Sequence, residues 1–167
     1  VGYNGLEPRV SIRYAIDDQS SIKAGFNRSF QYLNQISNTS SSTPVDIWQL
    51  SDFHIKPQQA YNYSLGYFRN FNSDKITSSL TGFYRELDKV IEYRDFADLL
   101  LNKNIERELV DGIGRSYGAE VNFELKSNKN NFLLNYTYSK SERQVLASTT
   151  QSAINNGNWF SSNYDKP

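Results

Sequence analysis

The sequence lacks three features that would place it in common functional classes. It contains no cysteine, which excludes a disulfide framework and a zinc site built on thiolates. Its 18 Lys and Arg residues balance 18 Asp and Glu residues, so no net positive field attracts nucleic acid or an anionic membrane surface. It has no run of about 18 apolar residues, the length that a membrane-spanning helix requires.

Aromatic residues are abundant instead, with 12 Tyr and 10 Phe in 167 residues, although the mean hydropathy is -0.65. In the stretch 58–71, Tyr61, Tyr63, Leu65 and Tyr67 occupy odd positions, and the even positions are mostly small or polar. This period of two predicts a strand with one apolar and one polar face. The low mean hydropathy is compatible with a membrane barrel, because every second residue of such a barrel faces a polar lumen.

Six segments show this alternation. They are residues 6–16, 21–32, 58–71, 75–86, 116–126 and 132–141. All reach the length of about 9–11 residues that a tilted membrane strand needs. Short connections follow the first, third and fifth segments, and long ones follow the others, so all long loops lie at one end.

The pattern predicts an all-β fold, an antiparallel up-and-down meander of about six long strands within a large transmembrane β-barrel. Because lipid tolerates no open sheet edge, we expect 1–167 to be a partial barrel domain whose remaining strands lie elsewhere. Residues expected to face lipid are Tyr61, Tyr63, Leu65, Tyr67, Tyr117, Val121, Phe123 and Leu125. Arg28 interrupts the apolar face of its strand, which places it either at the outer headgroup level or in a bulge that turns it away from lipid.

Aromatic residues of the long loops are the best candidates for ligand contacts, because their rings stack on sugars and line binding pockets. With the single histidine, the ligand-binding candidates are Trp48, Phe53, His54, Tyr93, Phe96, Trp159 and Phe160. The alternatives are an interfacial aromatic girdle, packing between loops and, for His54, a solvated loop position.

The second long loop contains five carboxylates, Asp95, Asp98, Glu106, Glu108 and Asp111, but without the spacing of a calcium loop, so we expect a charged outer surface and no metal or cofactor. Residues 97–101, with Ile105 and Leu109, fit a short amphipathic helix. The glycines of 112–114 fit a turn before the fifth strand. No set of nucleophile, acid and base stands out, so we expect no enzyme.

Six segments together resemble the barrel of TonB-dependent outer-membrane receptors, especially those of Bacteroidota. They read LEPRVSIRYAI (6–16), SIKAGFNRSFQYL (21–33), SNTSSSTPVDIW (37–48), IKPQQAYNYSLGYFRNF (55–71), GIGRSYGAEV (112–121) and INNGNWFSSNYDKP (154–167). The resemblance implies a 22-stranded barrel around an N-terminal plug, in the bacterial outer membrane. It also implies import of an iron chelate, cobalamin or a glycan, with energy supplied through TonB.

From the resemblance we expect outer-membrane lipid, the remaining barrel, the plug and the TonB system as partners, with a surface lipoprotein as an optional cap and no nucleic acid. The plug and TonB box are not recognised in residues 1–167, which look like six consecutive strands from the middle of the barrel. The alternative is a soluble all-β carbohydrate-binding module whose aromatic face packs against a second sheet or helices.

Overall fold

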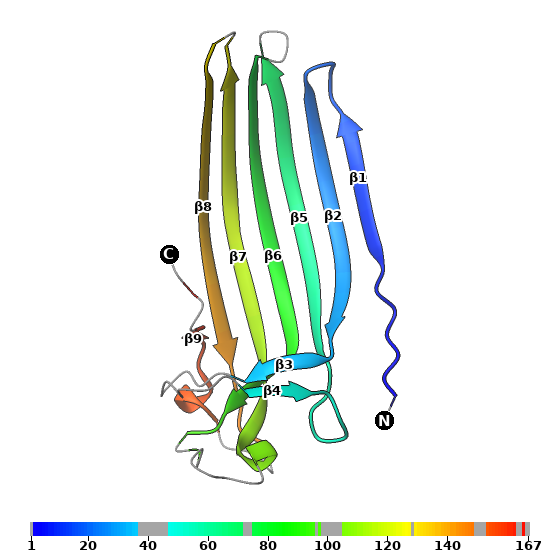
Figure 1. Cartoon of the computed structure of the whole chain (residues 1–167), viewed down its shortest axis with the longest axis vertical. Coiled ribbons are helices and arrows are strands. Elements are labelled where there is room, and N and C mark those ends of the chain that lie inside the picture. The colour runs from blue at the N-terminus through cyan, green and yellow to red at the C-terminus, as the bar shows by residue number, and fades with distance from the viewer. Residues whose placement is uncertain are drawn as a thin grey trace.

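The alternating segments form one long antiparallel sheet in the computed structural model, which describes residues 2–36, 47–71, 75–95, 97, 105–127, 129–148, 153–162 and 165 (Figure 1). Seven strands lie in the order β1-β2-β5-β6-β7-β8-β9. They are β1 (Arg9–Ala15), β2 (Ser20–Gln31), β5 (Gln58–Phe71), β6 (Ile76–Tyr93), β7 (Leu109–Lys126), β8 (Asn131–Gln144) and the short β9 (Phe160–Ser161). The predicted all-β meander is confirmed, and the sheet is open in this chain.

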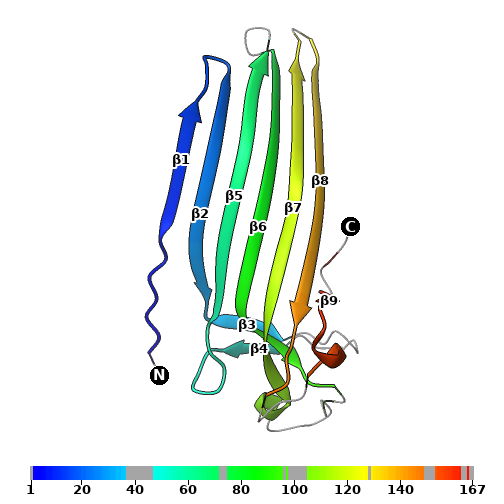
Figure 2. The same ribbon diagram turned by 180° about the vertical axis from the view of Figure 1, so that it is seen from behind.

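The loops segregate to the two ends of the sheet as predicted. The strand ends joined by the three short connections, which are Ala15 and Ser20, Phe71 and Ile76, and Lys126 and Asn131, lie at one end of the sheet, seen from both sides in Figures 1 and 2. At the other end lie the small β3–β4 sheet (Leu33–Ile36 and Ile47–Leu50) and the 3-10 turns η1 (Ile105–Glu108) and η2 (Asn155–Gly157). We call this second end the loop end.

The main differences from the predicted elements lie near the loop end. β6 continues to Tyr93 and β7 begins at Leu109, so both are longer than the predicted 75–86 and 116–126. The first long loop contains the β3–β4 hairpin, which pairs Leu33 with Leu50. The glycines of 112–114 lie inside β7 and not in a turn, so that prediction was wrong. Residues 98–101 of the predicted helix lie outside the described residues. Ala97 is in no helix, Ile105 starts η1 and Leu109 starts β7.

A β-bulge explains why the alternation of β6 is hidden in the sequence. Asp88 pairs with Ile113 and Val90 with Gly112, which leaves Lys89 as an extra residue without a partner in β7. Lys89 has a φ of 59°, in the left-handed region. One extra residue exchanges the two faces of the strand, so apolar positions beyond Lys89 no longer follow the earlier parity.

The register assigns each side chain to one of two faces. Across five strands, Ile22, Tyr67, Leu80, Val121 and Tyr136 fall in one row, and the next row contains Leu65 and Tyr138. We call this side the aromatic face, and it includes all eight residues predicted to contact lipid. The residues between them, such as Asn62, Ser64 and Glu120, form the polar face.

The aromatic face is uncovered in the described part of the chain. Leu65 is 61% exposed and Tyr136 62%, although both lie near the middle of long strands. Cross-strand rings pack on one another, with centroids 5.3 Å apart for Phe26 and Tyr63 and 6.5 Å for Tyr84 and Tyr117. No helix in the described ranges is long and apolar enough to cross a membrane.

Arg28 lies on the aromatic face in an unbroken stretch of β2–β5 pairing, directly opposite Tyr61. The bulge considered for this residue is therefore wrong. Its row, three residues from the end of β2, also contains Glu86, Arg115 and Glu142. The apolar rows thus end at a charged row on the side of the loop end.

Gly118 tests how tightly the long strands pack. A Cβ at this position would lie 2.2 Å from the carbonyl oxygen of Tyr138 and 2.8 Å from the ring of Phe83. We expect Gly118→Ala to lower the free energy of unfolding by about 1–3 kcal/mol, because a backbone atom has to move. A Cβ at Gly82 meets nothing closer than 4.0 Å, so Gly82→Ala is the control and should cost less than about 0.5 kcal/mol. Chemical unfolding of the detergent-solubilised protein measures both, and equal losses would contradict the account.

Candidate functional site

The polar face carries a hydrogen-bonded row of side chains across neighbouring strands. The Asn62 amide donates to Asn27 Oδ1 over 2.7 Å, and Arg85 Nε donates to Asn62 Oδ1. In the same row Arg9 stands beside Asn27, and Ser116 and Ser141 share a hydrogen bond of 2.8 Å. The register places all six residues side by side, since each is the cross-strand neighbour of the next.

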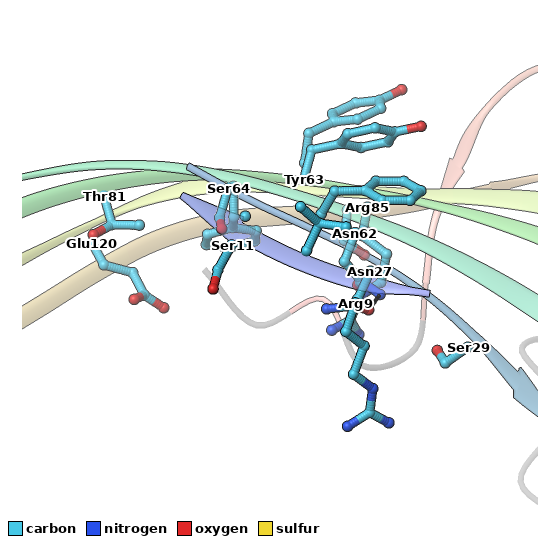
Figure 3. Close-up of a pocket in the computed structure, with 16 residues that line it drawn as sticks. Arg9, Ser11, Asn27, Ser29, Asn62, Tyr63, Ser64, Thr81, Arg85 and Glu120 are labelled. Atoms are coloured by element: carbon cyan, nitrogen blue, oxygen red, sulfur yellow. Dashed lines mark hydrogen bonds between the residues drawn. The ribbon is translucent and has the colours of Figure 1, made fainter. Parts of the chain in front are cut away.

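This row borders a hollow of about 890 Å³. In Figure 3, Arg9, Ser11, Thr81 and Glu120 point to one side of the sheet, and Tyr63 points to the other. Arg9 has no hydrogen-bond or ion-pair partner in the described ranges, so its guanidinium is available to a partner on this side. Two arginines, a carboxylate and several amides and hydroxyls suit a polar protein surface or a hydrated solute. The histidine is not in the lining, and no nucleophile–base pair is formed there.

Further charged side chains lie on the polar face. Glu120 is next to Thr81, and Glu124 receives hydrogen bonds from Thr77 and Asn131 and an ion pair from Lys126. Lys23 lies over the Phe68 ring, 4.5 Å from its centre.

The loop end contains every buried apolar side chain of the described residues. These are Ile55, Val90, Tyr93, Val110 and Val145. Gly112 permits this packing, because a Cβ there would lie 2.8 Å from Val145 and from the Gln144 carbonyl oxygen. Away from this end, no apolar side chain of the long strands is buried in the described ranges.

Ion pairs reinforce the loop end. Arg143 donates to Glu92 over 2.6 Å, and the Glu92 side chain is only 3% exposed. Arg94 binds Glu108 through two nitrogens, and these hydrogen bonds raise the pKa of Arg94. Because Glu108 pairs with Arg94, and Asp111 with Lys89 at 3.7 Å, these two carboxylates stabilise the loops. No group of three metal-ligating side chains occurs in the described ranges, which do not include Asp98.

The seven ligand-binding candidates are not brought together. Trp48 lies in β4 and is 58% exposed, and Phe53 follows it with 79% exposure and packs edge-on against His54. Tyr93 ends β6 and is buried, not in a loop as predicted. Phe96 lies outside the described residues, and Phe160 starts β9 opposite Arg143.

Trp159 occupies a different place from Trp48 and Phe53. The Arg115 guanidinium lies 4.1 Å from the centre of a Trp159 ring, and both residues line a groove together with Tyr61 and Tyr84. Trp159 therefore stands at the charged row that ends the aromatic face, as the girdle alternative describes.

Asp52 shapes the segment that presents Phe53 and His54. Its Oδ1 accepts hydrogen bonds of 2.8 Å from the backbone N–H groups of His54 and Ile55. The Ile55 N–H, followed by that of His54, lowers the pKa of Asp52 because both donors favour the ionised carboxylate. The turn is a hydrogen-bonded structure, which fixes the two exposed rings at the loop end.

The sequence model of a family described as "TonB dependent receptor-like, beta-barrel" matches residues 1–164. No curated protein and no solved structure matches the chain.

Arg143 tests the buried pairing at the loop end. Arg143→Ala removes the partner of a buried carboxylate whose other oxygen has no hydrogen bond in the described part of the chain. We expect a loss of about 3–5 kcal/mol in the free energy of unfolding. The control is Lys126→Ala, which breaks an exposed pair with Glu124 and should cost about 0–1 kcal/mol. If chemical unfolding gives the same small loss for both, the buried pair does not stabilise this end.

Proposed function

Because the chain belongs to the TonB-dependent receptor β-barrel family, we propose that it forms part of the wall of a receptor that imports a nutrient with energy passed through TonB. The family consists of receptors and transporters of the bacterial outer membrane and is not a family of enzymes. The observation that carries the proposal is the segregation of an exposed, mainly aromatic and aliphatic face from a hydrogen-bonded, mainly polar face over strands of membrane length.

In this proposal the aromatic face contacts lipid. Leu65 and Val121 lie within the hydrocarbon layer, and Tyr61, Tyr117 and Trp159 mark the outer boundary near the charged row. Arg69 and Phe71 lie near the inner boundary, where an arginine on the lipid side is tolerated best. This arrangement accounts for large exposed apolar side chains that a soluble protein would bury.

The polar face is then the barrel wall that meets the plug. Arg9 and Arg85 offer guanidinium donors along a row that is otherwise hydrogen-bonded within the sheet. A protein surface with carboxylates or backbone carbonyls satisfies such donors. Passage of a nutrient requires these contacts to be broken and remade, and polar contacts that water can replace suit that exchange.

The alternative, a soluble carbohydrate-binding module, is less well supported. That alternative requires a second sheet or helices packed over the aromatic face. The β3–β4 sheet instead lies across the end of the long strands (Figure 1). The outer-membrane location of the family also opposes a soluble module.

Trp48 and Phe53 are the ligand contacts that the geometry favours, because both rings are exposed at the loop end. We expect the double variant Trp48→Ala/Phe53→Ala to weaken ligand capture at the cell surface by about tenfold, since each lost aromatic contact is worth about 0.5–1.5 kcal/mol. The control is Tyr136→Ala, which removes an equally exposed ring from the aromatic face. Binding of labelled ligand to whole cells checks this, and unchanged capture would remove both residues from the site.

Uptake tests the proposed function itself. Cells that make the complete receptor are offered a labelled iron chelate, cobalamin and a glycan in parallel. We expect internal accumulation of one of them, abolished by dissipating the inner-membrane proton gradient, while surface binding persists. Accumulation that does not depend on the gradient would show a passive pore, and no accumulation of any class would refute the proposed import.

A further inference from the structure

Arg28 lies in a small basic cavity at the boundary between the aromatic face and the loop end. The cavity has a volume of about 340 Å³. Arg28, Lys56 and Lys89 line it together with Gln59, and no acidic residue lines it in the described ranges. Three cations around one cavity, without a carboxylate, indicate a site for an anion.

The guanidinium of Arg28 is held in a fixed orientation. Its Nη2 donates to Gln59 Oε1 over 2.8 Å, and its carbon lies 4.6 Å from the centre of the Phe30 ring and 5.4 Å from that of Tyr61. Its Nε is buried and has no hydrogen-bond partner in the described part of the chain. A guanidinium packed on rings, with a donor that lacks a hydrogen-bond partner, is the kind of group that binds phosphate oxygens.

The two lysines reach the cavity from separate elements. Lys89 is the extra residue of the β6 bulge, and its long contact of 3.7 Å with Asp111 is partly exposed. Lys56 precedes β5, is exposed, and has no ion-pair partner in the described ranges. The bulge therefore brings in a cation that regular pairing would direct to the polar face.

The N-terminal residues form the opposite wall. Residues 3–6 line the cavity, and Gly5 lies so close to Phe30 that a Cβ would meet its ring at 2.3 Å. The segment is held at both ends, since the Tyr3 hydroxyl donates to the Asp52 carbonyl oxygen and the Phe30 N–H donates to Glu7. Apolar and aromatic groups thus flank the cations, as they would flank a headgroup joined to acyl chains.

We propose that this cavity binds the phosphate group of an outer-leaflet lipid. Arg28 stands in the charged row that ends the aromatic face, so a lipid packed against Phe26 and Tyr63 places its headgroup at this level. Anionic headgroups are attracted by clustered Lys and Arg at a membrane surface. A lipid phosphate and free inorganic phosphate share the same chemistry, and the location favours the lipid.

The test uses the complete receptor in nanodiscs that contain an equal mixture of phosphorylated and dephosphorylated lipid A. Lipids retained after detergent extraction are counted by native mass spectrometry. We expect wild type to retain the phosphorylated form about tenfold over the dephosphorylated form, equivalent to about 1.4 kcal/mol. Arg28→Gln/Lys56→Gln should abolish the preference. The matched control is Arg69→Gln/Lys129→Gln, because Arg69 stacks on Phe71 on the same face of β5, at the other end of the sheet.

Each outcome decides the proposal. Equal retention of both lipids by wild type overturns it, and this result does not depend on any variant folding. A preference that persists in Arg28→Gln/Lys56→Gln, or is lost equally in the control, places the phosphate elsewhere and also overturns it. Displacement of the lipid by excess inorganic phosphate would assign the cavity to the free anion. Since lipid retention and not uptake is measured, failure here leaves the proposed transport untouched.

Discussion

Hydrogen bonding of the backbone is the constraint on which the rest of the structure depends. In a hydrocarbon environment an unpaired N–H or C=O group costs several kcal/mol, so the long strands have to be paired along their whole length. The ladders between β2, β5, β6, β7 and β8 meet this requirement with one irregularity, the bulge at Lys89. Fixed pairing also fixes which side chains share a face.

From this register follow two surfaces with different chemistry. The aromatic face is built from rows of Tyr, Leu, Val and Phe, and the polar face from rows in which Asn27, Asn62 and Arg85 bind one another. The long sheet is therefore stabilised by the backbone hydrogen bonds between its strands and by whatever surrounds the sheet, because its buried apolar side chains are confined to the loop end. The Arg143–Glu92 pair and Val145 hold that end together, where water is available and loops vary.

The sequence pattern predicted the strand 58–71 with the bounds that β5 has, since apolar and polar residues alternate there without a break. The predicted strand corresponding to β6 ended at residue 86, because the extra residue Lys89 exchanges the faces to which the following residues point. The sequence pattern also predicted a turn at the glycines of 112–114, whereas Gly112 and Gly114 are small because Val145 and Leu87 pack against the backbone. Such tertiary contacts leave no periodic signal.

Candidate ligand residues were harder to predict than strands. Trp48 and Tyr93 were both predicted as ligand contacts because they are aromatic residues near the long loops. Trp48 is exposed at the loop end, whereas Tyr93 is buried at the end of β6. Trp159 belongs to the boundary of the aromatic face because Arg115 packs on it, a pairing between residues far apart in the chain. In the sequence, Arg28 interrupts the apolar face of its strand. The rings of Phe30 and Tyr61, which pack against its guanidinium, explain its position.

The central claim is that the aromatic face contacts lipid and the polar face does not. Because this chain has no cysteine, single cysteines introduced along β5 can carry a nitroxide label in the complete receptor, cleared of any other cysteine, in a lipid bilayer. The account predicts that collisions with dissolved oxygen are frequent at positions 61, 63 and 65 and that a water-soluble nickel chelate is favoured at 62 and 64. Equal accessibility at all positions, or the opposite alternation, would contradict it.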